Sequence, residues 1–155
     1  MGVRSRLVRF VRIDKGRRRL LMEAGVCLLL ARIVLKALPF SLVARGLGGF
    51  GAPATGNPAT ASDRDAALAR DVRWAVRHAV GHVPFQAVCL PQALAARIML
   101  TRRRVGSVLH FGVTKVPSTG LVAHAWLDAA GVGVTGFPVD AEYAEIGLSI
   151  WPNRP

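Results

Sequence analysis

The spacing of the apolar residues changes once along the chain, near residue 105, and this change restricts the fold more than any other feature. Before it, apolar residues recur at helical spacing, as in Leu20, Ala24, Leu28, Ala31 and Leu35. After it, short apolar and β-branched runs alternate with turn-like segments. Helices followed by strands, rather than alternating with them, predict an α+β domain.

The helical part predicts three helices. The first covers about residues 17–37 and stops before a proline. The second begins at Ser62 or Asp63, whose side chains can cap a helix. The third begins at Cys89 or just after it, with Pro91 in the first turn, where a missing N–H breaks no helical hydrogen bond. Cys89 is therefore expected at a helix N-terminus.

The last third predicts strands over residues 107–115, 120–128 and 131–137. The intervening sequences "VPSTG" and "AAG" read as turns, so we expect an antiparallel meander. Ala, Val and Leu must fill most of the core, because only 6% of the residues are aromatic.

Charge and composition divide the chain into three parts. The chain has a net charge of +12, and residues 1–50 alone carry nine more basic than acidic residues. We assign residues 1–45 to a basic amphipathic helical segment, 46–62 to a Gly/Pro/Ala-rich linker and 63–155 to the main domain. The basic segment is compatible with an anionic membrane surface, a nucleic acid or an acidic protein partner, and charge alone does not choose among them. Of these, we expect no nucleic-acid partner.

The cysteine content favours a reducing compartment. Cys27 and Cys89 have no paired spacing that would predict a disulfide framework or a zinc site. The apolar run 24–31 lies between Glu23 and Arg32, is too short for a membrane span and precedes no signal-peptide cleavage site. We expect a cytoplasmic protein, with contact to a membrane surface left open.

Cys89 is the candidate nucleophile. Unpaired N–H groups at a helix start favour the thiolate and can bind the oxyanion formed when it attacks a carbonyl. The alternative is a small buried hydrophobic residue, which is the commonest role of a free cysteine. Cys27 lies inside the first predicted helix, so we expect it in the core or an interface.

His124 is the candidate base. It lies in "AHAWLD", residues 123–128, where strand geometry puts His124, Trp126 and Asp128 on one face and apolar residues on the other. A lone histidine on such a strand is usually a hydrogen-bonded core residue. A thiol nucleophile, however, needs a base that is remote in sequence and near in space.

The other histidines predict no metal site. His78 and His82 are four residues apart, but no carboxylate or further histidine completes a ligand set. His110 lies on the first predicted strand, where packing is the expected role. No motif for a cofactor is present, and we expect none.

Several segments together resemble one protein family. The segments "CLPQALAARIMLTRRR", "HFGVTK", "AHAWLD" and "YAEIG", with "EAGVCLLLARIVLKALPF" upstream, are similar to the leader peptidases of lasso peptide biosynthesis, typified by the microcin maturation protease. These enzymes are transglutaminase-like cysteine hydrolases. The resemblance extends over nearly the whole chain from about residue 5.

The resemblance implies a transglutaminase-like, papain-like cysteine protease core in residues 63–155, with Cys89 as nucleophile and His124 as base. Some relatives carry a leader-recognition domain ahead of the protease, whereas this chain begins with basic helix and linker, so it resembles the split form. The implied partners are a precursor peptide, a separate leader-recognition (RRE) protein and a lasso cyclase that closes the macrolactam.

The third catalytic residue is open. Many relatives place an aspartate twelve residues after the histidine, and that position is Gly136 here. Asp128 shares a strand face with His124, but four residues of strand separate them by about 13 Å. Asp128 is therefore too far away to orient the imidazole.

Asp140 is our preferred third residue, because it follows Pro138, where the chain can bend back toward the site. The alternative is a backbone or amide oxygen, and Gln86 and Gln92 supply the nearby amides.

Three functions remain possible from the sequence. The first is a cysteine endopeptidase that removes a leader. The second is another acyl transfer through the same thioester, such as amidation or cross-linking. The third is a non-enzymatic adaptor that acts through its basic segment.

Overall fold

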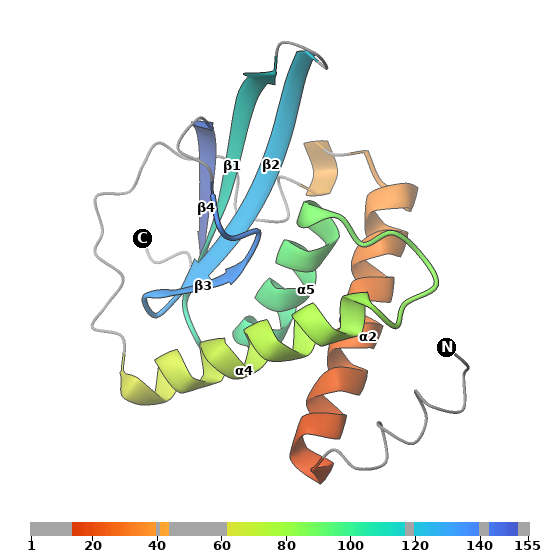
Figure 1. Cartoon of the computed structure of the whole chain (residues 1–155), viewed down its shortest axis with the longest axis vertical. Helices are drawn as coiled ribbons and strands as arrows, with labels where there is room; N and C mark the ends of the chain where they lie inside the picture. The colour runs from red at the N-terminus through yellow and green to blue at the C-terminus, as the bar shows by residue number, and fades with distance from the viewer. Residues whose placement is uncertain (1–13, 40, 44–61, 117–119, 140–142, 152–155) are drawn as a thin grey trace.

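The computed structural model describes residues 14–39, 41–43, 62–116, 120–139 and 143–151. The helices precede the strands and pack on a four-stranded antiparallel sheet, which confirms the predicted α+β class (Figure 1). In chain order the elements are α2 (Lys15–Ala37), α4 (Asp63–Val80), α5 (Cys89–Arg102), β1 (Ser107–Val116), β2 (Gly120–Ala129), β3 (Val132–Thr135) and β4 (Ala144–Trp151).

Side-chain caps set the starts of the first two helices. The carboxylate of Asp14 accepts a hydrogen bond from the amide of Gly16 at 3.0 Å, so α2 begins two residues before the predicted start. The hydroxyl of Ser62 accepts from the amide of Asp65 at 3.1 Å, which confirms the predicted cap of α4. The predicted linker 46–62 lies outside the described residues except for Ser62.

The helices share one core. α2 packs against both α4 and α5, and Figure 1 shows it at the side of the molecule away from β4. The basic segment thus contributes a buried face to the same core as the main domain. Small side chains let the helices approach closely, as the composition predicts. The fully buried alanines on the helices are Ala24, Ala69, Ala75, Ala93, Ala95 and Ala96.

The sheet has the order β3-β2-β1-β4. The first three strands form the predicted meander. β4 was not predicted, and it returns to pair with β1 at the opposite edge from β3. The third strand ends at Thr135, before its predicted end, because Gly136 has a φ of +78° that breaks the extended backbone.

The two faces of the sheet differ. Leu109, Ala125 and Leu127 are buried and belong to the core that the helices cover. Strand alternation puts His124 and Trp126 on the other face, as predicted. The polar side chains of the site therefore lie on the face that the core does not occupy.

An ion pair joins α2 to the end of α5. Both carboxylate oxygens of Glu23 accept hydrogen bonds from the guanidinium of Arg103, at 3.0 and 2.6 Å, and both side chains are about four-fifths buried. The hydrogen bond from Arg103 outweighs burial and holds the pKa of Glu23 below its ordinary value of 4.5. Arg102 also approaches Glu23, but its side chain is 68% exposed.

We predict that Arg103→Ala lowers the free energy of unfolding by about 1–3 kcal/mol at pH 7, because it leaves Glu23 without its bidentate partner. Arg102→Ala is the control and should change it by less than about 0.5 kcal/mol. The folded-state pKa of Glu23 is lowered, so the stabilisation is complete above pH 4.5 and disappears as the pH falls through the lowered pKa. Urea unfolding at pH 7 and pH 3 measures both effects, and equal losses for the two variants would contradict the assignment.

Candidate active site

The start of α5 differs from the starts of the other two helices. Asp14 and Ser62 cap α2 and α4, whereas Val88 precedes α5 and no side chain in the described part of the chain caps it. Cys89 is the first residue of α5. The amides of Cys89 and Leu90 are therefore available at the positive end of the helix, where an anion binds favourably.

Gln92 holds the turn that leads into α5. Its side-chain amide donates to the carbonyl of Ala87 at 2.6 Å. Gln92 therefore supports the backbone before Cys89. The hydrogen bond of its side chain in the structure goes to Ala87, and not to the imidazole of His124.

The two cysteines have different environments. Cys27 is buried on α2, as predicted, and burial raises the pKa of its thiol. Cys89 is only partly buried and packs at the margin of the core. Cys89 is thus the more accessible of the two thiols.

His124 has a fixed orientation. Its Nε2 lies 2.8 Å from the carbonyl oxygen of Gly136. Because a carbonyl oxygen only accepts hydrogen bonds, Nε2 must carry the proton, and the lone pair of the neutral ring is left on Nδ1. The ring also lies against Trp126 and Tyr143, with ring centroids 5.9 and 5.2 Å away. Nδ1 is the nitrogen that can act as a base.

Gly136 stands where the resemblance expects an aspartate. Its φ is +78°, and a Cβ there would lie 2.6 Å from the carbonyl oxygen of Ala125. The fold therefore has no room for an acidic side chain at this position. A backbone oxygen, which was the alternative in the sequence, accepts from His124 instead. The preferred residue, Asp140, lies outside the described residues.

His110 lies between two carboxylates. Its Nδ1 is 2.5 Å from Oε1 of Glu145 and its Nε2 is 2.5 Å from Oδ2 of Asp128. Burial disfavours the charged ring, but the hydrogen bonds to Asp128 and Glu145 outweigh it and raise the pKa of His110 above its ordinary value of 6.5. Asp128 thus binds His110.

The sequence missed this cluster. Glu145 comes from β4, which was not predicted, and its pairing with β1 brings it beside His110. The His110 ring stacks on Trp126 with centroids 5.3 Å apart. The close approach of Trp126 depends on Gly112, where a Cβ would lie 2.8 Å from the indole. The rings of His110, Trp126 and His124 stack in one row on this face of the sheet.

The two candidate catalytic residues lie on packed elements. α5, which carries Cys89, packs against β2, which carries His124. The described residues include no hydrogen bond between them. The ladder between β2 and β3 runs only from Leu127 to Ala129, so among the described residues no strand pairs with β2 on that side at His124, where the Gly136 carbonyl lies instead.

His78 and His82 each bind a backbone carbonyl. Their Nδ1 atoms lie 2.8 Å from the carbonyl oxygens of Trp74 and His78. Within the described ranges no group of three or more His, Cys, Asp or Glu side chains could hold a metal ion. The two nitrogens of His110 point to opposite carboxylates, so that cluster cannot chelate one ion.

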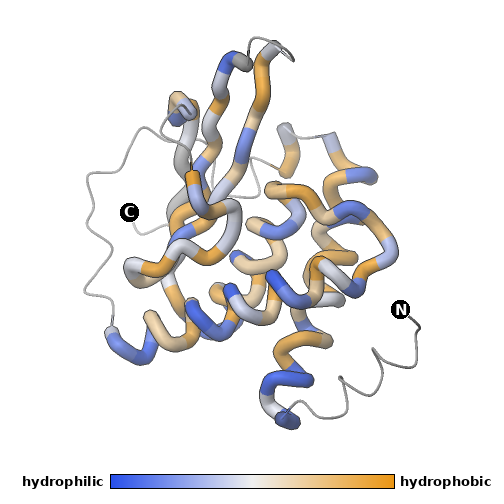
Figure 2. The backbone as a smooth tube through the Cα atoms, viewed as in Figure 1, coloured by the Kyte–Doolittle hydropathy of each residue, from blue (hydrophilic) through white to orange (hydrophobic). Residues whose placement is uncertain are grey.

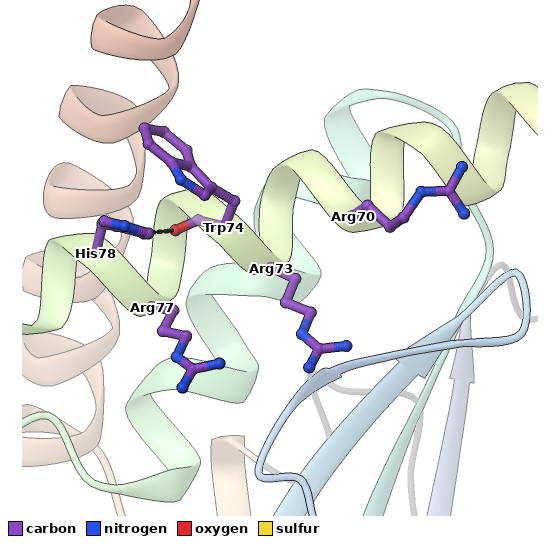
Figure 3. Close-up of a pocket in the computed structure, with 5 residues that line it drawn as sticks. All are labelled: Arg70, Arg73, Trp74, Arg77 and His78. Carbon is purple, nitrogen blue, oxygen red and sulfur yellow. Dashed lines mark hydrogen bonds between the residues drawn. The ribbon is translucent and has the colours of Figure 1, made fainter. Parts of the chain in front are cut away.

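A shallow hollow of about 570 Å³ lies along α4. In Figure 3, Arg73 and Arg77 extend below the helix, Trp74 lies above it, and Arg70 and His78 lie toward its right and left ends. The guanidinium of Arg17, on α2, lies 5.1 Å from the Trp74 ring, which ties the two helices together. The arginine row gives this side of α4 a positive potential.

The fold and the site define an α+β domain with a cysteine at an uncapped helix start and an oriented histidine on the adjoining sheet. Residues 34–147 match the model of the transglutaminase-like superfamily, which is more than half of the chain, and the chain belongs to this superfamily. Its members are usually cysteine proteases or acyltransferases. Searches of curated proteins and of solved structures give no significant match.

No helix in the described part of the chain is long and apolar enough to cross a membrane.

We predict that Gly136→Ala destabilises the fold by at least about 2 kcal/mol more than Gly131→Ala. Both positions have positive φ values, but a Cβ at Gly131 meets no atom within 4 Å, whereas one at Gly136 meets the Ala125 carbonyl. Urea unfolding measures the difference. Equal losses would show that the space beside His124 is not restricted.

We predict that the His110 imidazole titrates above pH 6.5 and that Asp128→Asn moves its pKa down. Because the folded-state pKa is raised, the stabilisation is complete below pH 6.5 and disappears as the pH rises through the raised value. NMR titration of the ring protons measures the shift. Asp63→Asn, on α4, should leave it unchanged, and an unaltered pKa in Asp128→Asn would contradict the assignment.

Proposed function

We propose that the protein is a cysteine endopeptidase that removes the leader from a lasso peptide precursor, with Cys89 as nucleophile and His124 as base. The observation that carries the catalytic part is the hydrogen bond from Nε2 of His124 to the Gly136 carbonyl. In the neutral ring this bond leaves the lone pair on Nδ1, and a general base needs such a lone pair on an oriented ring.

The uncapped start of α5 supports the role of Cys89. A helix N-terminus favours the thiolate, and the free amides of Cys89 and Leu90 can donate to an oxyanion. Membership of the transglutaminase-like superfamily supports the same chemistry.

We propose that the pair meets at the edge of β2 near His124. α5 ends just before β1, whose start pairs with the end of β2 near Asp128. A helix of 14 residues is about 21 Å long, which corresponds to about six residues of strand. If α5 runs along β2, its start is level with the region around His124. His124 faces away from the core side, so the proposal requires the thiol and the imidazole to approach each other around the edge of β2, beside Gly136. Such contacts are often long in a free enzyme and tighten with substrate.

The reaction then follows from the chemistry of the pair. Nδ1 of His124 takes the thiol proton, and the thiolate of Cys89 forms a C–S bond with the scissile carbonyl carbon. The oxyanion receives hydrogen bonds from the α5 amides. When the C–N bond breaks, the imidazolium gives its proton to the leaving amine. Water then attacks the thioester, with His124 accepting its proton, and the thiol is regenerated.

The leader as substrate is supported by the resemblance of the segments around Cys89 and His124 to lasso leader peptidases. The proposal includes a separate leader-recognition protein that presents the precursor, and a cyclase that uses the released core peptide. We propose no nucleic-acid partner and no cofactor.

We predict that Cys89→Ala abolishes cleavage and that His124→Ala slows it at least about a hundredfold, because each removes one partner of the proton transfer. The assay combines the protein with a lasso precursor peptide and a leader-recognition protein, and mass spectrometry identifies the products. Cys27→Ala is the control and should retain cleavage, since Cys27 is buried in the core.

The products separate the alternatives. Two fragments whose masses sum to that of the precursor plus one water support the peptidase. Loss of ammonia with cross-linking would instead show transglutamination. Cleavage by Cys89→Ala protein at the wild-type rate would overturn the proposal, and absence of any product with the wild-type protein would favour the adaptor.

A further inference from the structure

α2 has a second apolar face that the core does not cover. Its inner face is buried against α4 and α5 through Leu21, Ala24, Cys27, Leu28 and Ala31. The opposite face carries large aliphatic side chains that are 39–62% exposed: Met22, Val26, Leu29, Leu30, Ile33 and Val34. We call these six residues the outer stripe. A helix that is apolar on both faces normally has a partner on each.

Basic residues lie at both ends of the outer stripe. Steps of three or four residues lead from Lys15 and Arg19 through the outer stripe to Lys36, so these cations lie on the same helix face. Figure 2 shows hydrophilic residues at the start of α2 and apolar residues along its middle. Long basic side chains can lay their methylene groups on an apolar surface while their charged ends reach outward.

No free carboxylate opposes these cations on α2. Asp14 caps the helix, and Glu23 is bound to Arg103. Residues 1–13, which precede α2, add four arginines and no acidic residue to the sequence. The charged residues of α2 that border the outer stripe are therefore basic.

This charge pattern argues against a second copy as the occupant. Two outer stripes packed together, parallel or antiparallel, would bring cationic ends against cationic ends. The outer stripe also lacks the Trp, Tyr and Arg residues that carry most binding energy in protein interfaces. Aliphatic side chains between cations are instead the pattern of a helix that lies in the interface of an anionic membrane.

We propose that α2 binds an anionic lipid surface, with the outer stripe entering the acyl boundary and Lys15, Arg19 and Lys36 contacting the headgroups. The helix lies flat and does not span the bilayer. This inference is independent of the catalytic proposal, because no residue of the outer stripe belongs to the candidate active site.

The test is flotation of the full chain with vesicles of phosphatidylcholine and phosphatidylglycerol (3:1), compared with phosphatidylcholine alone. We expect at least about fivefold more protein to float with the anionic vesicles, and high salt to reduce the difference. The double variant Val26→Glu/Ile33→Glu should lose at least about tenfold of the binding, because it places charges in the acyl boundary.

Matched control variants distinguish binding through α2 from nonspecific hydrophobic binding and from binding through net positive charge. Leu121→Glu/Ile146→Glu changes two residues that are 74% and 65% exposed on the sheet and should leave flotation unchanged. Lys15→Gln/Arg19→Gln/Lys36→Gln should weaken binding, whereas Arg70→Gln/Arg73→Gln/Arg77→Gln, which removes three positive charges from α4 (Figure 3), should not. Circular dichroism checks that each variant is folded.

Three results would overturn the proposal. The first is no flotation of the wild-type protein with anionic vesicles. The second is an equal loss in the α2 and control variants. The third is a wild-type dimer that Val26→Glu/Ile33→Glu converts to a monomer without any change in flotation, which would assign the outer stripe to self-association.

Discussion

The hydrogen bond from His124 to the carbonyl of Gly136 is the interaction on which the site depends. It decides which imidazole nitrogen carries the proton, and therefore which one is free to accept another. An aspartate would provide both orientation and negative charge, whereas a backbone carbonyl provides orientation with only a partial charge. Asp128 and Glu145 lie on the same sheet face but bind His110, whereas the described hydrogen bond of His124 is to the carbonyl. Trp126 lies between the two histidines and contacts both rings.

Helix packing and one ion pair fix the position of α5, and so of Cys89 at its start. Small side chains on α4 and α5 allow close helix packing, and the Glu23–Arg103 pair fixes α2 to the end of α5. The end of α5 is fixed by this ion pair, and one face of the helix is buried. Cys89 lies in the uncapped first turn, and the hydrogen bond from Gln92 to Ala87 supports the backbone before it. The ion pair and the proposed nucleophile thus lie at opposite ends of α5.

Local signals in the sequence predicted what is local in the structure. The Ser62 cap, the helix that begins with Cys89, and the two faces of the strand around His124 all follow from spacing and residue type. β4 was missed because its place in the sheet depends on pairing with β1, more than 30 residues earlier in the chain. Glu145 and the His110 cluster were missed with it. The acceptor of His124 was left open because it is a backbone oxygen, which no side-chain motif can reveal, although the glycine at the expected aspartate position was the signal to look for one.

The most direct test of the central claim is the rate at which iodoacetamide alkylates Cys89, measured against pH in the Cys27→Ala background with and without His124→Ala. If Nδ1 of His124 accepts the Cys89 proton, the protein with His124 reacts rapidly near pH 6, well below the ordinary thiol pKa of about 8.5. Without His124 that reactivity moves toward the ordinary value. Identical pH profiles for the two proteins would contradict the Cys89–His124 pair.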